Sequence, residues 1–142
     1  MMEVLISNRQ SAVKIDSGLV KKIGLFVLDC LGTASTELSI SFVSEEESQQ
    51  LNKAYRNKKK KAEVLSFPMD EKDLIGDVVI APSISEAKAR SEGVAFYDRI
   101  AYMMIHGVLH LSGKTHNDGE NALEMEKLEA KILGGLKKEG IL

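Results

Sequence analysis

Apolar residues recur along the chain at two spacings, which predict strands and helices in turn. Short apolar or near-alternating runs, bounded by polar or turn-forming residues, predict four strands. They lie at 4–7, 38–43, 64–67 and 75–81. Helical spacing and capping residues predict five helices. These lie at 16–31, 44–55, 84–92, 96–111 and from Asn117 or Asp118 onward.

The interleaving of strands and helices favours a single mixed α/β domain over residues 1–142. About four strands are expected in a mixed sheet, packed with about five helices. The segment 75–81 is nearly all apolar and is therefore expected inside the sheet. Pro68 is expected to end the third strand, which makes 69–73 a turn. The order of the strands does not follow from the pattern.

Composition narrows the classes of protein that fit. The net charge is −2, so contact with nucleic acid would need a local basic patch. The single cysteine, Cys30, excludes an intrachain disulfide and a thiolate zinc site, and its apolar neighbours predict that it is buried. The N-terminal residues do not resemble a signal peptide, and no apolar run approaches the roughly 20 residues of a membrane span. A cytoplasmic protein is therefore expected.

The candidate chemistry centres on the three histidines, which all fall within eleven residues: His106, His110 and His116. Residues four apart lie on one helix face, so His106 and His110 can point two imidazoles at one ion. Gly113 can end the helix and let His116 reach the same ion. Three nitrogen ligands leave a tetrahedral position open, which is typical of a catalytic zinc. Two histidines at helical spacing can be a coincidence, but the clustering of every histidine in one window favours a metal.

The helix predicted at 96–111 is apolar on most sides and is therefore expected to be buried. It would mount two ligands rigidly and place the metal site at its end. Metzincin proteases share the histidine spacing, and their general base is a glutamate directly after the first histidine. Gly107 occupies that position here, so the ligands are present and the protease base is not.

A second candidate site is the basic segment from Arg56 to Lys61, with five cations in six residues. The alternative is a solvated loop whose charges complement a helix C-terminus. Arginine differs from lysine because its planar fork matches a phosphate with two hydrogen bonds. Arg56 close to a metal would suit phosphoryl transfer. The sequence alone does not show that Arg56 approaches the histidines.

Three ordered blocks of residues resemble the YbeY family of bacterial rRNA-maturation endoribonucleases. The first contains Leu51-Asn52, Tyr55-Arg56, Lys58, Lys60 and Val64-Leu65-Ser66-Phe67-Pro68. The second is Gly76-Asp77-Val78-Val79-Ile80, and the third runs from His106-Gly107 to His116. The resemblance implies a single α/β domain, one divalent ion, expected to be zinc, on His106, His110 and His116, and a functional Arg56 near that ion.

The resemblance also implies a function. It is a metal-dependent, single-strand-specific endoribonuclease activity in 16S rRNA 3′-end maturation and ribosome quality control. The implied partners are rRNA and the small ribosomal subunit, with no DNA and no membrane expected. Lys58 and Lys60 match the family's Lys-x-Lys segment and are predicted to bind substrate. The oligomeric state does not follow from the sequence.

Some residues leave the mechanism open. Lys114-Thr115 replace the family's Tyr-Asp, so Thr115 cannot supply a carboxylate that orients a ligand. No general base stands out, and Glu63 and Asp77 are the carboxylates nearest the motifs. One alternative is a non-catalytic ribosome-assembly or RNA-binding factor with a structural metal, for which Asp118 would be the fourth ligand. Another is a metal-dependent hydrolase of a different substrate.

Overall fold

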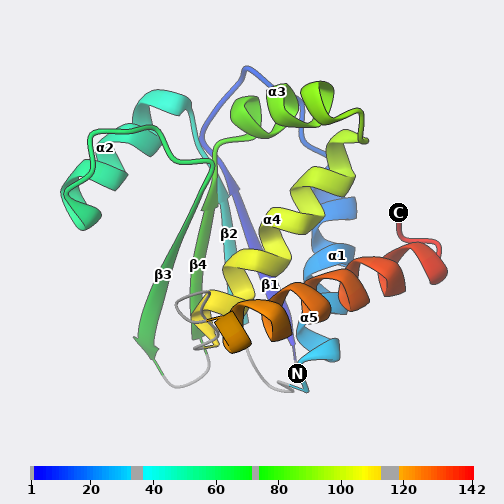
Figure 1. Ribbon diagram of the computed structural model, residues 1–142. Helices are drawn as coiled ribbons and strands as arrows, with labels where there is room; N and C mark the ends of the chain where they lie inside the picture. The colour runs from blue at the N-terminus through cyan, green and yellow to red at the C-terminus, as the bar shows by residue number, and fades with distance from the viewer. Residues whose placement is uncertain (1, 33–36, 72–73, 113–118) are drawn as a thin grey trace.

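Four strands build one mixed sheet (Figure 1). They are β1 (Glu3–Asn8), β2 (Glu37–Phe42), β3 (Val64–Glu71) and β4 (Leu74–Ile80). The order across the sheet is β1-β2-β4-β3, with β1, β2 and β4 parallel and β3 antiparallel to β4. The computed structural model describes residues 2–32, 37–71, 74–112 and 119–142. The predicted mixed sheet and the interior position of the 75–81 strand are confirmed.

Five helices surround this sheet, as predicted (Figure 1). They are α1 (Ser17–Cys30), α2 (Glu45–Arg56), α3 (Pro82–Glu92), α4 (Phe96–Leu111) and α5 (Gly119–Lys138). Val78 and Ile80 of β4 pack into the main core with α1, α4 and α5. Val79, between them, faces the other side and packs with Leu65 and Leu51 of α2. The two faces of the sheet therefore carry different helices.

Helix α4 is the centre of the main core. Ile100, Met104 and Ile105 are completely buried, and so are Val108 and Leu109 one turn further on. The helix has the predicted bounds, and the prediction that it is buried is confirmed. A side chain mounted on α4 is consequently held by a packed, rigid element. None of the helices in the described part of the chain is long and apolar enough to cross a bilayer.

Two expectations from the sequence are wrong. Strand β3 continues through Pro68, which pairs with Gly76, and reaches Glu71. Proline is tolerated there because β3 is an edge strand, so a missing N–H on its outer side costs no ladder hydrogen bond. Cys30 is exposed rather than buried, because the buried face of α1 ends at Leu28.

Candidate metal centre

His106 and His110 bring two ring nitrogens together on one face of α4. Their Nε2 atoms are 3.0 Å apart, and the ring centroids are 4.5 Å apart. Two imidazoles bound tetrahedrally to zinc at about 2.0–2.1 Å would place their nitrogens roughly 3.3 Å apart. The helical spacing thus produces a pair of donors close to the separation that one ion requires.

The third predicted ligand, His116, lies outside the described residues, as do Gly113, Lys114-Thr115 and Asp118. Among the side chains that are described, no three of His, Cys, Asp and Glu form a group able to hold an ion. The donor chemistry of the two imidazoles fits zinc and other first-row divalent ions. Three-histidine coordination stays a prediction.

A buried glutamate that the sequence analysis did not single out lies behind the first histidine. Glu129 of α5 is 4% exposed, and its Oε2 lies 3.3 Å from Nδ1 of His106. The available signal was a carboxylate within an apolar stripe, since Met125, Ile132 and Leu136 on the same helix are also buried. Metal-binding histidines commonly donate their second N–H to such a group.

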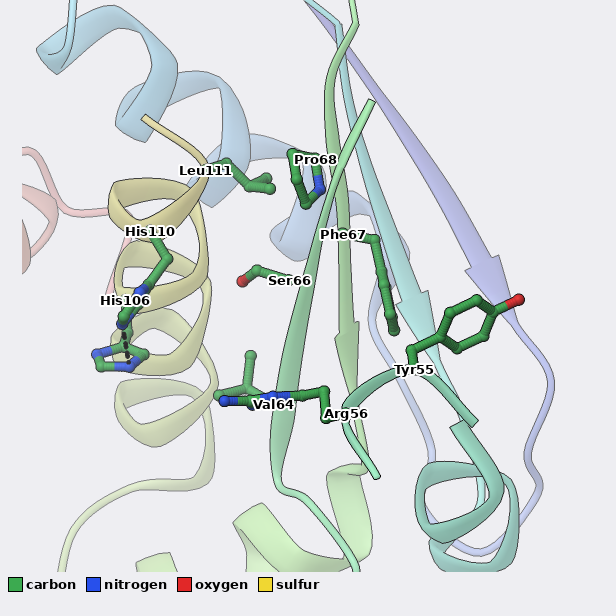
Figure 2. Close-up of a pocket in the computed structure, with 9 residues that line it drawn as sticks. All are labelled: Tyr55, Arg56, Val64, Ser66, Phe67, Pro68, His106, His110 and Leu111. Atoms are coloured by element: carbon green, nitrogen blue, oxygen red, sulfur yellow. Dashed lines mark hydrogen bonds between the residues drawn. The ribbon is translucent and has the colours of Figure 1, made fainter. Parts of the chain in front are cut away.

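The histidines open into a cavity of about 690 Å³ that also contains Arg56 (Figure 2). The wall opposite α4 is formed by β3. The lining residues are Tyr55, Arg56, Val64, Ser66, Phe67, Pro68, His106, His110 and Leu111. Residues 50 positions apart in the sequence therefore meet at one site, which the sequence alone left open.

Arg56 owes its position to the way α2 ends. It is the last residue of the helix, and Asn57 then adopts a left-handed conformation with φ of 54° that turns the chain away. The guanidinium extends past Val64 toward the helix that carries the histidines (Figure 2). Within the described part of the chain, Arg56 forms no ion pair, so its charge is available to a ligand.

Lys58 and Lys60 are exposed in the loop that follows Arg56, and neither lines the cavity. The backbone of this loop is fixed to α2. Gln49 and Asn52 each donate a side-chain N–H, 2.8 Å long in both cases, to the carbonyls of Lys59 and Lys60. The lysines therefore project from a defined loop near the cavity rather than from its floor.

Neither carboxylate considered as a general base faces the histidines. Glu63 is 6% exposed at its side chain and accepts two hydrogen bonds from Arg99, at 2.6 and 2.9 Å. Although burial acts in the opposite direction, the Arg99 and Lys88 cations hold the pKa of Glu63 below its usual range. Its lone pairs are thus engaged in an internal ion cluster.

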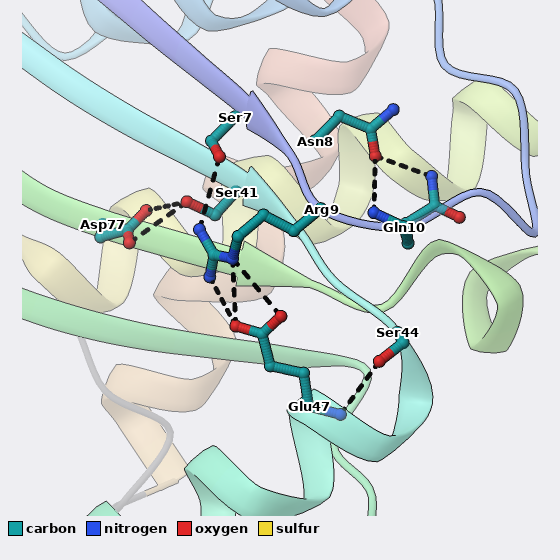
Figure 3. A network of polar contacts seen from close by, with 8 residues as sticks. All are labelled: Ser7, Asn8, Arg9, Gln10, Ser41, Ser44, Glu47 and Asp77. Carbon is teal, nitrogen blue, oxygen red and sulfur yellow. Dashed lines mark hydrogen bonds and ion pairs between the residues drawn. The ribbon is translucent and has the colours of Figure 1, made fainter.

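Asp77 lies on the opposite face of the sheet, in a second cavity of about 430 Å³. It accepts a hydrogen bond from the Ser41 hydroxyl at 3.2 Å (Figure 3). Arg9 lines the same cavity but is bound to Glu47 through Nε and Nη2, at 3.1 and 2.8 Å. The charges in this cavity are therefore paired within the protein.

The packing of α4 explains why Gly107 replaces the protease glutamate. A Cβ at this position would come within 2.7 Å of Val78 Cγ1 and 3.2 Å of Ser66 Oγ. Ser66 also donates to the Gly107 carbonyl at 3.1 Å, which ties β3 to α4 beside the cavity. This face of α4 lies directly on the sheet, so no acidic side chain fits there.

Comparison with known proteins gives the same result over nearly the whole chain. The family model described as Endoribonuclease YbeY matches residues 5–137. The Endoribonuclease YbeY of Geobacter metallireducens is 31% identical, with 99% of this chain and 100% of the relative aligned. That of Aquifex aeolicus is 34% identical, with 95% and 92% aligned.

Among solved structures, TM1509 from Thermotoga maritima has a similar fold. Its TM-score is 0.64 at 24% identity, with 99% of this chain and 95% of that protein covered. At this level of identity the likeness concerns the fold alone, and it agrees with the mixed four-stranded sheet and five helices described above.

Proposed function

This chain belongs to the YbeY family, and we propose that it is a metal-dependent, single-strand-specific endoribonuclease that matures the 3′ end of 16S rRNA. The family makes it an RNA-cleaving hydrolase. The observation that carries the more specific proposal is the shared cavity, where Arg56 faces the paired imidazoles of His106 and His110.

We propose that His106, His110 and His116 hold one divalent ion, with zinc as the expected metal. The converging Nε2 atoms of the first two histidines support this assignment. A bound ion would supply Lewis-acid chemistry at a phosphate oxygen and lower the pKa of water in the site.

Arg56 is the proposed catalytic residue. Its planar guanidinium can bind two oxygens of a phosphate, and its lack of an ion pair within the described residues leaves both donor edges available. It would stabilise the negative charge that builds up on the scissile phosphate. Glu63 and Asp77 are not proposed as proton acceptors, because both point to other partners.

Lys58 and Lys60 are proposed to bind the RNA backbone next to the cavity. Both are exposed, and the loop that carries them is fixed by Gln49 and Asn52. Each phosphate that a lysine neutralises releases counterions, so binding should weaken with salt. A cavity enclosed between α4 and the edge strand β3 favours one strand over a duplex.

We further propose that residues 1–142 form one functional domain that acts on the small ribosomal subunit in the cytoplasm. A role in ribosome quality control belongs to the same proposal. These assignments follow from the family rather than from the geometry of the cavity.

Cleavage of a labelled single-stranded RNA that carries a 16S rRNA 3′ end tests the proposal. Native protein, chelator-stripped protein, His110→Ala and Arg56→Ala would be compared, and the metal content of each sample measured. Cleavage by native protein alone, with metal retained in Arg56→Ala, is the expected result. Native protein that holds metal but leaves the RNA intact would favour the assembly-factor function, and turnover of a different substrate would favour another hydrolase.

A further inference from the structure

Glu129 is a carboxylate placed where a helix of this kind normally carries an apolar residue. It is 4% exposed, and Met125 and Ile132 on the same face of α5 are 2% exposed. Burial of a carboxylate is costly unless a strong hydrogen-bond partner compensates for lost water. The position of Glu129 therefore requires a reason beyond the packing of α5.

His106 provides that reason. Its Nδ1 lies 3.3 Å from Glu129 Oε2, so the imidazole can donate Nδ1–H to the carboxylate. A neutral imidazole carries one proton, so a proton on Nδ1 leaves a lone pair on Nε2. That Nε2 is the atom 3.0 Å from Nε2 of His110, on the cavity side of the ring.

Tyr102 fixes the ring from a second direction. Its ring is stacked on that of His106, with centroids 6.5 Å apart and planes 22° apart. Burial and the neighbouring Glu129 carboxylate raise the pKa of the Tyr102 phenol, which places that carboxylate beside both rings. Tyr102 and His106 are four residues apart on α4, so one rigid helix sets their spacing.

We infer that Glu129 is a positioning residue of the metal centre: its carboxylate accepts Nδ1–H of His106 and thereby directs the Nε2 lone pair into the cavity. The negative charge also makes Nε2 a stronger donor. Glu129 does not touch the substrate and acts only through His106. This inference rests on the proposed metal site, but not on RNA cleavage.

Zinc affinity and the histidine tautomer test the inference together. The zinc dissociation constant of the full chain would be measured by competition with a chromophoric chelator. Glu129→Leu should weaken zinc binding by about 10–100-fold, and Glu129→Gln, which keeps an acceptor but no charge, by about 10-fold. Glu124→Gln, an exposed glutamate on the same helix, is the matched control and should change the constant less than twofold.

Nitrogen-15 spectra of the imidazoles supply a readout that a purely structural role would not move. In the zinc-free wild type the proton of His106 should sit on Nδ1, and Glu129→Leu should lose that preference while thermal unfolding shows a folded protein. If Glu129→Leu does not fold, Glu129→Gln carries the test alone.

Two results would overturn the inference. One is a zinc affinity within twofold of wild type in every folded Glu129 variant, or a His106 proton on Nε2 in the wild type. The other is a wild-type chain that binds no zinc, which would also remove the proposed metal centre. Loss of RNA cleavage with zinc binding still dependent on Glu129 would count against the nuclease proposal and support this one.

Discussion

Arg56 and Glu63 lie at the two ends of one short loop, and the protein treats their charges in opposite ways. Glu63, just before β3, is buried and bound by Arg99 of α4 and Lys88 of α3. Arg56, at the end of α2, is exposed, lines the histidine cavity and has no ion pair among the described residues. One end of the loop therefore holds the fold together, and the other presents charge to a ligand.

The same contrast separates the two cavities that share Tyr55, Phe67 and Pro68 as a wall. On one face of the sheet, Arg9 is bound to Glu47 and Asp77 to Ser41 (Figure 3). On the other face, Arg56 and the paired histidines point into the cavity (Figure 2). A charged residue near a cavity is thus a better functional candidate when the protein leaves its hydrogen bonds unused.

The largest expected effect is on the anchored end of the loop. Glu63→Gln should lower the free energy of unfolding by about 3–5 kcal/mol, because Arg99, only 15% exposed, loses its charged partner. Chemical denaturation at neutral pH measures this loss. Glu92→Gln is the control, since Glu92 is 52% exposed and meets the same arginine at 3.2 Å, and it should cost less than about 1 kcal/mol. Equal losses in both variants would contradict the comparison.

The ion cluster also predicts an acid dependence. The pKa of Glu63 lies below its ordinary value of 4.5 in the folded protein. The unfolded chain therefore binds this proton first, and the stabilisation is complete above pH 4.5 and lost as the pH falls through the lowered value. Unfolding free energies measured from pH 7 to pH 3 should converge for wild type and Glu63→Gln. A constant difference over this range would exclude the ion pair as its source.

At the open end, Arg56→Ala should slow RNA cleavage by about 10²–10³-fold, the usual effect of removing one donor to a developing charge. The unfolding midpoint and the metal content should not change, because Arg56 makes no ion pair within the described chain. Arg9→Ala is the matched control on the other face of the sheet. It should remove the bonds to Glu47 and leave cleavage within about threefold of wild type. A similar loss of cleavage in both variants would sink the distinction between the two cavities.

A smaller effect is expected at the lysines. The double variant Lys58→Ala, Lys60→Ala should weaken binding of an uncleaved RNA analogue and reduce the slope of log affinity against log salt by about 2. Titrations at several salt concentrations give this slope. An unchanged slope would show that the exposed loop lysines do not contact phosphate.

Lys61 should show the smallest effect. It belongs to the same basic run but pairs with Glu45 at 3.3 Å, and its side chain is 47% exposed. Lys61→Ala should lower the free energy of unfolding by less than about 1 kcal/mol and leave the salt slope of RNA binding unchanged. A slope reduced as much as by Lys58→Ala would place Lys61 in the RNA site instead.

Much of the fold could be predicted from sequence because local patterns decide local elements. Asp16 and Ser44 accept hydrogen bonds from Leu19 and Glu47 and begin α1 and α2 close to where the pattern places them. Pro68 was misjudged because its tolerance depends on the strand being at an edge, and an edge exists only once the strand order is known.

The sequence by itself determined which residues could carry chemistry here. The spacing of His106 and His110 sets a donor pair, because residues four apart share a helix face, and the buried α4 follows from its apolar residues. The tertiary structure alone decided which distant groups join them. It placed Arg56 in the cavity, turned Asp77 to the other face and brought Glu129 against His106. Such contacts depend on how strands are ordered and helices are packed, and no local spacing encodes that arrangement.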